Sequence, residues 1–267
     1  MLGAIAGDIV GSAYQRSPVT HAQFPLFQAA AAFTDKTVLL VAVADALLAD
    51  GGYAASLRRW GRRYPRAGYR PQFYRWLFSP HLEPYYSYAN DAAARACPVG
   101  YAFDSGPAVL EQSCRSAAVT HHHPEGVEGA QAVALSVFLA RRGESKQCIR
   151  QALTDRLGYD LSRPLSDIRP TYRFDPSCRG SVPPAITAFL ESENVEDAIR
   201  KAISLGGDTG TLACIAGGIA EAFFQTVPES IVQEVESRLP VEFINTIDAF
   251  YQRFALTTRT RRPAGVA

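Results

Sequence analysis

The chain has 267 residues, of which 47% are hydrophobic and 20% charged, a composition that excludes wholesale disorder and suits a globular domain. Its 27 Lys and Arg residues against 26 Asp and Glu residues leave a formal net charge of +1. This balance gives no global attraction to nucleic acid or to an anionic membrane.

The first ten residues, MLGAIAGDIV, have no cationic leader segment and make a poor secretory signal peptide. No stretch approaches the ~20 consecutive apolar residues that a membrane span needs. The five cysteines lie far apart without C-x-x-C spacing, so neither a zinc site nor a disulfide framework is indicated. We therefore expect a cytoplasmic protein without a membrane partner.

The first strong helical pattern covers residues 38–48, which are almost entirely apolar. Thr34 and Asp35 precede it and suit the N-cap and the first turn of a helix. A helix that is apolar on every side is expected to be buried on every side.

A second apolar helix is predicted over residues 209–224. Its Gly217-Gly218 pair is compatible with a helix where another helix packs closely against it. Convincing alternation of period two is absent, so the predicted fold class is all-α. Further helices are predicted at residues 129–142, 184–191 and 195–205, the last with Asn194 as its N-cap.

Residues 160–182 contain three prolines and are predicted to form a loop. No Gly/Ser-rich linker divides the chain, which indicates one compact domain over residues 1–256. The basic segment at residues 257–267 is expected to be a frayed tail.

Both apolar helices begin with a similar polar head. Thr34-Asp35-Lys36-Thr37 precedes the first, and Gly207-Asp208-Thr209-Gly210-Thr211 precedes the second. Helix capping explains one such acid, whereas two matching heads on buried helices favour a shared polar centre. Oxygen-rich motifs of this kind suit hard cations such as Mg²⁺.

Six segments carry a further signal in a fixed order along the chain. They are GAIAGD at residues 3–8, TDKT at 34–37, RRWGRRYPRAGY at 58–69, YSYANDAAARACPVGYAF at 86–103, THHHPEG at 120–126 and SLGGDTGTLACIAGGIAEA at 204–222. Together they resemble the ADP-ribosylglycohydrolase family, which includes the dinitrogenase reductase-activating glycohydrolases and the ADP-ribosyl-acceptor hydrolases. The resemblance implies a compact helical domain, usually a monomer, with a cleft for ADP-ribose.

In active relatives, the resemblance implies, two Mg²⁺ ions lie in this cleft and water attacks the anomeric carbon of the distal ribose. The family's metal-binding positions that this chain keeps are Thr34, Asp35, Asp208 and Thr211. It departs from the family at three positions: Gln15 replaces a Glu, and Lys36 and Gly210 each replace an Asp.

Relative to the family, these three substitutions add four positive charges, which equals the charge of two Mg²⁺ ions. The resemblance therefore predicts that the dinuclear centre is lost and that no metal cofactor is needed. Lys36 is expected to replace a metal, or to pair with Asp35 or Asp208. One surviving Mg²⁺ site at Thr34, Asp35, Asp208 and Thr211 is the alternative.

The cleft departs from the family in two further places. Active relatives read roughly Ser-Tyr-Gly-Asn-Gly where this chain has SYAND at residues 87–91, and often Tyr-Gly-Gly where it has Tyr69-Arg70-Pro71. Asp91 adds a negative charge, and it is expected to partner Lys36 or to obstruct the distal ribose.

Two helix N-termini, the Gly206-Gly207 turn and Lys36 together suit a phosphate group. In the run His121-His122-His123 consecutive side chains point in different directions, which disfavours zinc, whereas one of them is expected to contact the ligand. The candidate ligand-binding residues are Asn90, Asp91, His121, His123, Gly206, Gly207 and Thr209.

Residues 58–76 contain seven arginines among aromatic residues. This pattern is compatible with phosphate contacts and base stacking in nucleic acid, but Arg side chains that cover a helix surface explain it as well. Because the family shares much of the pattern, we expect no nucleic-acid partner.

Two main hypotheses follow. In the first, the protein binds ADP-ribose, an ADP-ribosylated protein or a related phosphorylated ligand without the Mg²⁺-dependent reaction. In the second, it hydrolyses ADP-ribosyl or related glycosidic bonds, with Asp35, Asp91 or Asp208 as a general base and Lys36 stabilising negative charge. A conventional hydrolase with one Mg²⁺ ion is the third possibility.

Overall fold

The structure is a computed structural model that describes residues 1–49, 52–81, 83–254 and 256. In these residues it contains fifteen helices and, in place of strands, one isolated antiparallel bridge between Ala89 and Ser177. The predicted all-α class is confirmed, whereas the predicted tail at 257–267 lies outside the described residues. The helices are α1 (Leu2–Tyr14), α2 (Asp35–Leu48), α3 (Tyr53–Arg63), α4 (Pro71–Phe78), α5 (Asp91–Ala94), α6 (Cys97–Ala102), α7 (Gly106–Ala118), α8 (Pro124–Arg141), α9 (Lys146–Leu157), α10 (Leu165–Ile168), α11 (Cys178–Leu190), α12 (Val195–Ile203), α13 (Thr209–Phe224), α14 (Glu229–Ser237) and α15 (Val241–Arg253).

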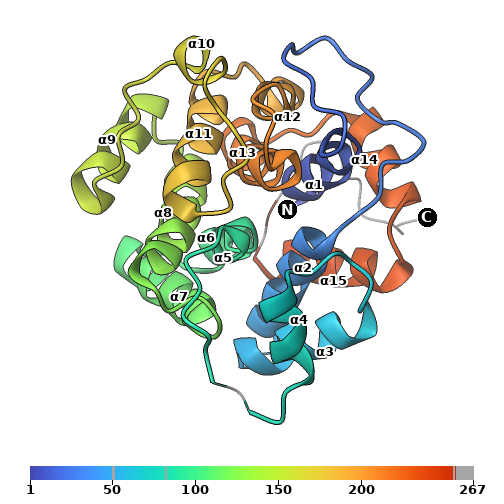
Figure 1. Cartoon of the computed structure of the whole chain (residues 1–267). Helices are drawn as coiled ribbons and strands as arrows, with labels where there is room; N and C mark the ends of the chain where they lie inside the picture. The colour runs from blue at the N-terminus through green and yellow to red at the C-terminus, as the bar shows by residue number, and fades with distance from the viewer. Residues whose placement is uncertain (50–51, 82, 255, 257–267) are drawn as a thin grey trace.

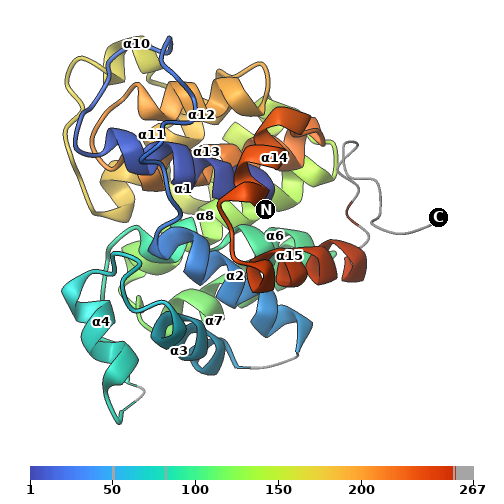
Figure 2. The ribbon, with the colours of Figure 1, turned by 90° about the vertical axis from the view of Figure 1, so that its right-hand side faces the viewer.

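Helix α13 occupies the centre of the domain, where it packs against α1, α8, α11 and α12 (Figures 1 and 2). Its longest contact is with α1, and glycines make this contact close. A Cβ atom added at Gly3 or Gly7 would overlap the backbone of α13, and one added at Gly217 would overlap the backbone of α1. The predicted helix at 209–224 is therefore confirmed, together with the close packing that its glycines require.

Helix α2 is the second buried helix, and its residues 37–44 are all buried. It packs against α3, α6 and α15. Thr34 is its N-cap, and the Thr34 hydroxyl accepts a hydrogen bond from the Lys36 amide at 3.4 Å. The predicted cap is confirmed, and the predicted burial is confirmed for residues 38–44 and 46, whereas Asp45, Leu47 and Leu48 are only partly buried.

The prediction of a loop at 160–182 is wrong at two places. Helix α10 lies within it, and α11 begins at Cys178 rather than at the predicted residue 184. The Ser177 hydroxyl caps α11 by accepting from the Gly180 amide at 3.0 Å. Pro183 and Pro184 then lie inside the helix, where their fixed φ suits helical backbone although they donate no amide hydrogen bond.

The other predicted helices are confirmed with shifted ends. The helix expected at 129–142 starts earlier, at Pro124, and the helix expected at 195–205 ends at Ile203. Asn194 caps the latter as predicted, because its side-chain oxygen accepts from the Asp197 amide at 2.9 Å. No helix among the described residues is long and apolar enough to cross a membrane.

Candidate functional site

The head of α2 is held in place by Asp8 of α1. This carboxylate is fully buried and accepts hydrogen bonds from the backbone amides and the hydroxyls of both Thr34 and Thr37. Four donors to one carboxylate compensate its charge without a cation. The Gly-Asp pair near the start of the chain thus orients the Thr34-Asp35-Lys36 head.

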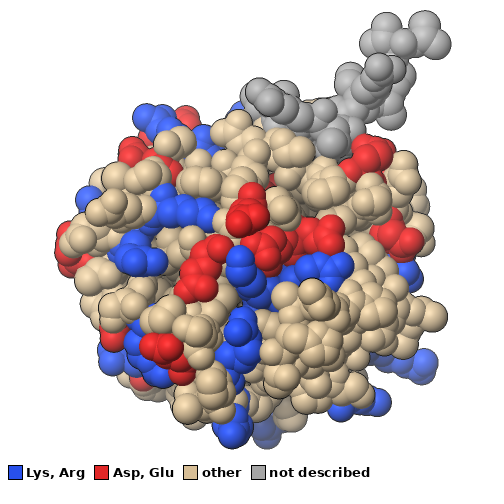
Figure 3. All heavy atoms as spheres, turned by 90° about the horizontal axis from the view of Figure 1, so that it is seen from above, with Lys and Arg blue, Asp and Glu red and all other residues tan. Residues whose placement is uncertain are grey.

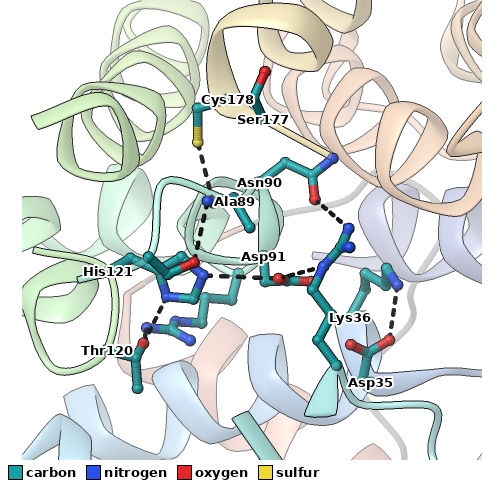
Figure 4. Close-up of polar contacts among 12 residues, drawn as sticks. Asp35, Lys36, Ala89, Asn90, Asp91, Thr120, His121, Ser177 and Cys178 are labelled. Carbon is teal, nitrogen blue, oxygen red and sulfur yellow. Dashed lines mark hydrogen bonds and ion pairs between the residues drawn. The ribbon is translucent and has the colours of Figure 1, made fainter. Parts of the chain in front are cut away.

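Asp35 and Lys36 form an ion pair at this head. Lys36 Nζ donates to Asp35 Oδ1 at 2.8 Å (Figure 4), so of the two partners expected for Lys36, Asp35 is the one in direct contact. Burial raises the pKa of Asp35 to about 6, although the charge of Lys36 opposes the shift. Burial acts to lower the pKa of Lys36, but Asp35 and then Asp208 outweigh it and raise that pKa, so Lys36 is a cation at neutral pH.

The head of α13 faces the head of α2. Gly206 and Gly207 have φ of +74° and +67°, and this left-handed backbone, which glycine adopts readily, brings Asp208 to the N-cap of α13. Asp208 is 1% exposed, and its Oδ2 accepts from the Asn90 side-chain amide at 3.2 Å. Thr209, which the sequence predicts as a ligand contact, is buried and donates to the Gly11 carbonyl at 2.7 Å.

Asp91 begins α5 and is also buried. Its Oδ2 lies 2.9 Å from Arg70 Nε and 3.7 Å from His121 Nε2. Burial acts to raise the pKa of Asp91, but His121, Arg70 and Lys36 outweigh it and hold that pKa well below its ordinary value. Of the two roles expected for Asp91, direct pairing with Lys36 is therefore replaced by pairing with Arg70.

Arg70 is the site residue that the sequence reasoning missed. Its side chain bridges the two acids, since Nη2 lies 3.4 Å from Asp208 Oδ2 in addition to the contact with Asp91. The sequence signal was the departure from Tyr-Gly-Gly at residues 69–71, but nothing in the sequence indicated where this guanidinium would point. We call the carboxylates of Asp35, Asp91 and Asp208, with Lys36 and Arg70, the acidic centre.

The orientation of His121 is set by a chain of hydrogen bonds. Arg95 Nη2 donates to Thr120 Oγ1 at 2.9 Å, and this hydroxyl lies 2.7 Å from His121 Nδ1. A guanidinium only donates, so we assign the Thr120 proton to the bond with His121 Nδ1. The His121 proton is then on Nε2, which faces Asp91 (Figure 4), and burial lowers the pKa of this imidazole so that it is neutral.

The other two histidines lie further from the acidic centre. His123 caps α8, because its Nδ1 accepts from the Glu125 amide at 3.2 Å. The ring of exposed Tyr86 stands edge-on to both His122 and His123. Exposed Tyr88 also contacts His123, so aromatic rings are available to a ligand beside this loop.

A cavity of about 550 Å³ is lined by residues from the end of α9 into α11. Tyr172 lines this cavity, and its ring approaches Gly207 so closely that a Cβ atom on the glycine would lie 2.7 Å from it. Further lining residues that can contact a polar ligand are Arg163, Thr171, Arg173, Asp175 and Arg179. The sequence reasoning read this segment as a loop and assigned it no site.

The arginine-rich stretch is largely used within the fold. Arg58 donates from Nη2 to the Trp76 carbonyl at 2.9 Å, and Arg62 donates from Nε to the Leu77 carbonyl at 2.6 Å, so both satisfy the end of α4. On the opposite face of the molecule, seen from above in Figure 3, Lys and Arg side chains lie interspersed with Asp and Glu side chains. The guanidinium groups of Arg58 and Arg62 thus cap α4, whereas those of Arg59 and Arg63 pair with Asp45 and Glu242.

The residues present do not fit a dinuclear Mg²⁺ centre. Gln15 is exposed at the end of α1, Gly210 offers no side-chain oxygen, and Lys36 places an ammonium group among the carboxylates. Arg70 adds a second cation there, and like charge disfavours a metal ion at these positions. In the described part of the chain, no group of three or more His, Cys, Asp or Glu side chains has an arrangement that could hold a metal.

An all-α domain whose two buried helices present acidic heads to one centre defines the class of protein. The ADP-ribosylglycohydrolase family model matches residues 1–262, and the chain belongs to this family. It is 27% identical to the ADP-ribosylhydrolase ARH3 of Bos taurus, over 88% of this chain and 87% of the relative, and 28% identical to that of Homo sapiens, over 88% of each. A solved structure named ADP-ribosylglycohydrolase-related protein complex has the same fold, with a TM-score of 0.71 and 24% identity over 94% of this chain and 95% of that one.

Proposed function

We propose that this protein binds ADP-ribose, or an ADP-ribosylated protein, at the acidic centre without Mg²⁺. The observation that carries the proposal is the placement of two side-chain cations, Lys36 and Arg70, against three buried carboxylates. These cations supply positive charge where the family resemblance implies metal ions. A ligand would then meet a preformed, compensated site.

The surroundings of the centre support a nucleotide-sized ligand. Exposed Tyr86 and Tyr88 offer aromatic faces on one side, suited to stacking against a base. The cavity of about 550 Å³ has arginines in its wall, suited to phosphate oxygens, and its lining residue Tyr172 packs against Gly207. We assign Asn90, His121, Gly206 and Gly207 to ligand positioning, as the sequence predicted, and add Arg70 to that set.

The test is a pair of thermal-unfolding titrations, one with ADP-ribose in EDTA and one with Mg²⁺ alone. A ligand of the native state raises the apparent Tm in proportion to RT ln(1 + [L]/Kd), so millimolar concentrations detect even weak sites. We expect ADP-ribose to raise the Tm and Mg²⁺ to leave it unchanged. No shift with ADP-ribose would refute the proposal.

A matched pair of variants locates the binding. Lys36→Met removes one of the two cations of the acidic centre, and Lys201→Met removes a lysine that pairs with Asp197 on the surface of α12. We expect the first to weaken ADP-ribose binding about tenfold or more and the second to leave it unchanged. Equal effects would place the ligand elsewhere.

A hydrolase is the second candidate, and the pKa of Asp35 favours it. A carboxyl group with a pKa of about 6 exchanges a proton near neutral pH and suits general acid–base catalysis. Lys36 at 2.8 Å would stabilise negative charge as it develops. Release of ADP-ribose from ADP-ribosylated protein in EDTA, abolished by Asp35→Asn, would establish this activity; no release by the wild type would exclude it for that substrate.

A further inference from the structure

Arg70 joins two acids that come from distant parts of the chain. Its Nε lies 2.9 Å from Asp91 Oδ2 at the start of α5, and its Nη2 lies 3.4 Å from Asp208 Oδ2 at the head of α13. Nη2 also lies 3.4 Å from Asn90 Oδ1. The guanidinium therefore occupies the space between the two carboxylates, and its fixed fork geometry suits this bridging role.

The charge of the acidic centre depends on this guanidinium. Three carboxylates face two cations, and His121, whose Nδ1 is assigned as the acceptor from the Thr120 hydroxyl, carries a single ring proton. Outside this set, the buried Asp8 carboxylate is compensated by its four hydrogen-bond donors, and the buried Arg95 donates to the Ser116 carbonyl and the Thr120 hydroxyl. Without Arg70 the centre would hold two uncompensated negative charges, which is the charge that one divalent cation neutralises.

The same centre contains oxygen atoms that lack a protein partner. Three buried oxygen atoms have no hydrogen-bond partner within the described chain: Asp91 Oδ1, Asp208 Oδ1 and Thr211 Oγ1. Loss of Arg70 would also leave Asp208 Oδ2 with the Asn90 amide as its hydrogen-bond donor and Asp91 Oδ2 facing only His121 Nε2. Carboxylate and hydroxyl oxygens, completed by water, are the ligands that Mg²⁺ and Mn²⁺ take in proteins.

We propose that Arg70 is the resident counter-ion of the acidic centre and holds Asp91 and Asp208 together in place of a dissociable metal. Its removal converts the centre into a site for one divalent cation. This role of Arg70 deepens the proposed function. It rests on that proposal in one respect, the binding of a ligand at the acidic centre. The preference for metal-free binding thus depends on this side chain at the N-cap of α4, in addition to Lys36.

The experiment compares Arg70→Ala with Arg75→Ala, which removes an exposed arginine of the same helix α4. Thermal unfolding is recorded for each protein in EDTA, in millimolar Mg²⁺ and in millimolar Mn²⁺, and bound Mn²⁺ is counted by electron paramagnetic resonance. We expect the Tm of Arg70→Ala to be lowered in EDTA and raised by either metal by about 2–4 °C or more, with one Mn²⁺ bound per chain. Wild type and Arg75→Ala should show neither effect.

Two results would overturn the proposal: a folded Arg70→Ala protein without a metal response, or a wild-type protein that binds Mn²⁺ with the same shift. If Arg70→Ala does not fold in EDTA, Arg70→Gln removes the same charge while keeping donor groups, and the same criteria apply to it. The titration of wild type with ADP-ribose is separate. Failure of that titration alone refutes the proposed function, and failure of the metal response alone refutes the role of Arg70.

Discussion

Replacement of Asp8 by alanine should destabilise the protein severely. The substitution removes the acceptor of four hydrogen bonds that join α1 to the head of α2 and leaves the amides and hydroxyls of Thr34 and Thr37 unpaired in a buried region. A hydrogen bond to a charged group contributes about 1.5–3 kcal/mol, but bonds that share one acceptor are not additive. We expect the free energy of unfolding to fall by about 3–5 kcal/mol, as when one partner of a buried charged network is removed.

This loss is large against the roughly 5–15 kcal/mol of a typical domain, and urea unfolding followed by tryptophan fluorescence measures it. Asp8→Asn keeps the shape and one acceptor oxygen, so its loss should be smaller, about 1–3 kcal/mol. Asp155→Ala, at an exposed position of α9, is the control and should change stability by about 0.5 kcal/mol or less. A loss below about 1 kcal/mol for Asp8→Ala, with an unchanged m-value, would refute the role assigned to Asp8.

Three further predictions concern pH, a tautomer and close packing. Burial raises the pKa of Asp35 to about 6, so its protonated form stabilises the fold below about pH 4 and this contribution is lost as the pH rises through 6. The free energy of unfolding of wild type minus that of Asp35→Asn should therefore fall by about 2–3 kcal/mol between about pH 4 and pH 7. A difference that does not change with pH would contradict the raised pKa of Asp35. Thr120→Val should change the ring ¹⁵N chemical shifts of His121 to those of a mixture of tautomers, and Thr120→Ser should restore the wild-type shifts. Unchanged shifts in the valine variant would disprove that the Thr120 hydroxyl donates to His121 Nδ1. Gly7→Ala should lower the free energy of unfolding by about 3 kcal/mol or more, because the added methyl group would overlap the backbone of α13. Gly106→Ala is the control, because a Cβ atom there meets no atom within 4 Å. Similar melting temperatures for the two variants would show that α1 and α13 can separate.

The predictions that succeeded from sequence depend on local chemistry. The apolar runs at 38–48 and 209–224 specify buried helices because no face of either suits water. The caps at Thr34 and Asn194 follow from side chains that bond to amides within three residues. The prediction of a loop at 160–182 failed because its prolines were taken as breakers of the whole segment, although Pro164 and Pro176 stand just before α10 and α11, where a proline does not interrupt a helix.

The amino-acid sequence by itself determined the helical class, the family and the two acidic helix heads. It also determined that Lys36 and Gly210 stand where the family resemblance predicts aspartates. Only the tertiary structure decided which charges meet, since Arg70, Asp91 and Asp208 come from separate elements whose side-chain directions no local pattern specifies. The same holds for Asp8, whose four donors lie at least 26 residues away along the chain. Charge compensation is a property of distance in space and of burial, and so the centre could be suspected from its residues but assembled only by the fold.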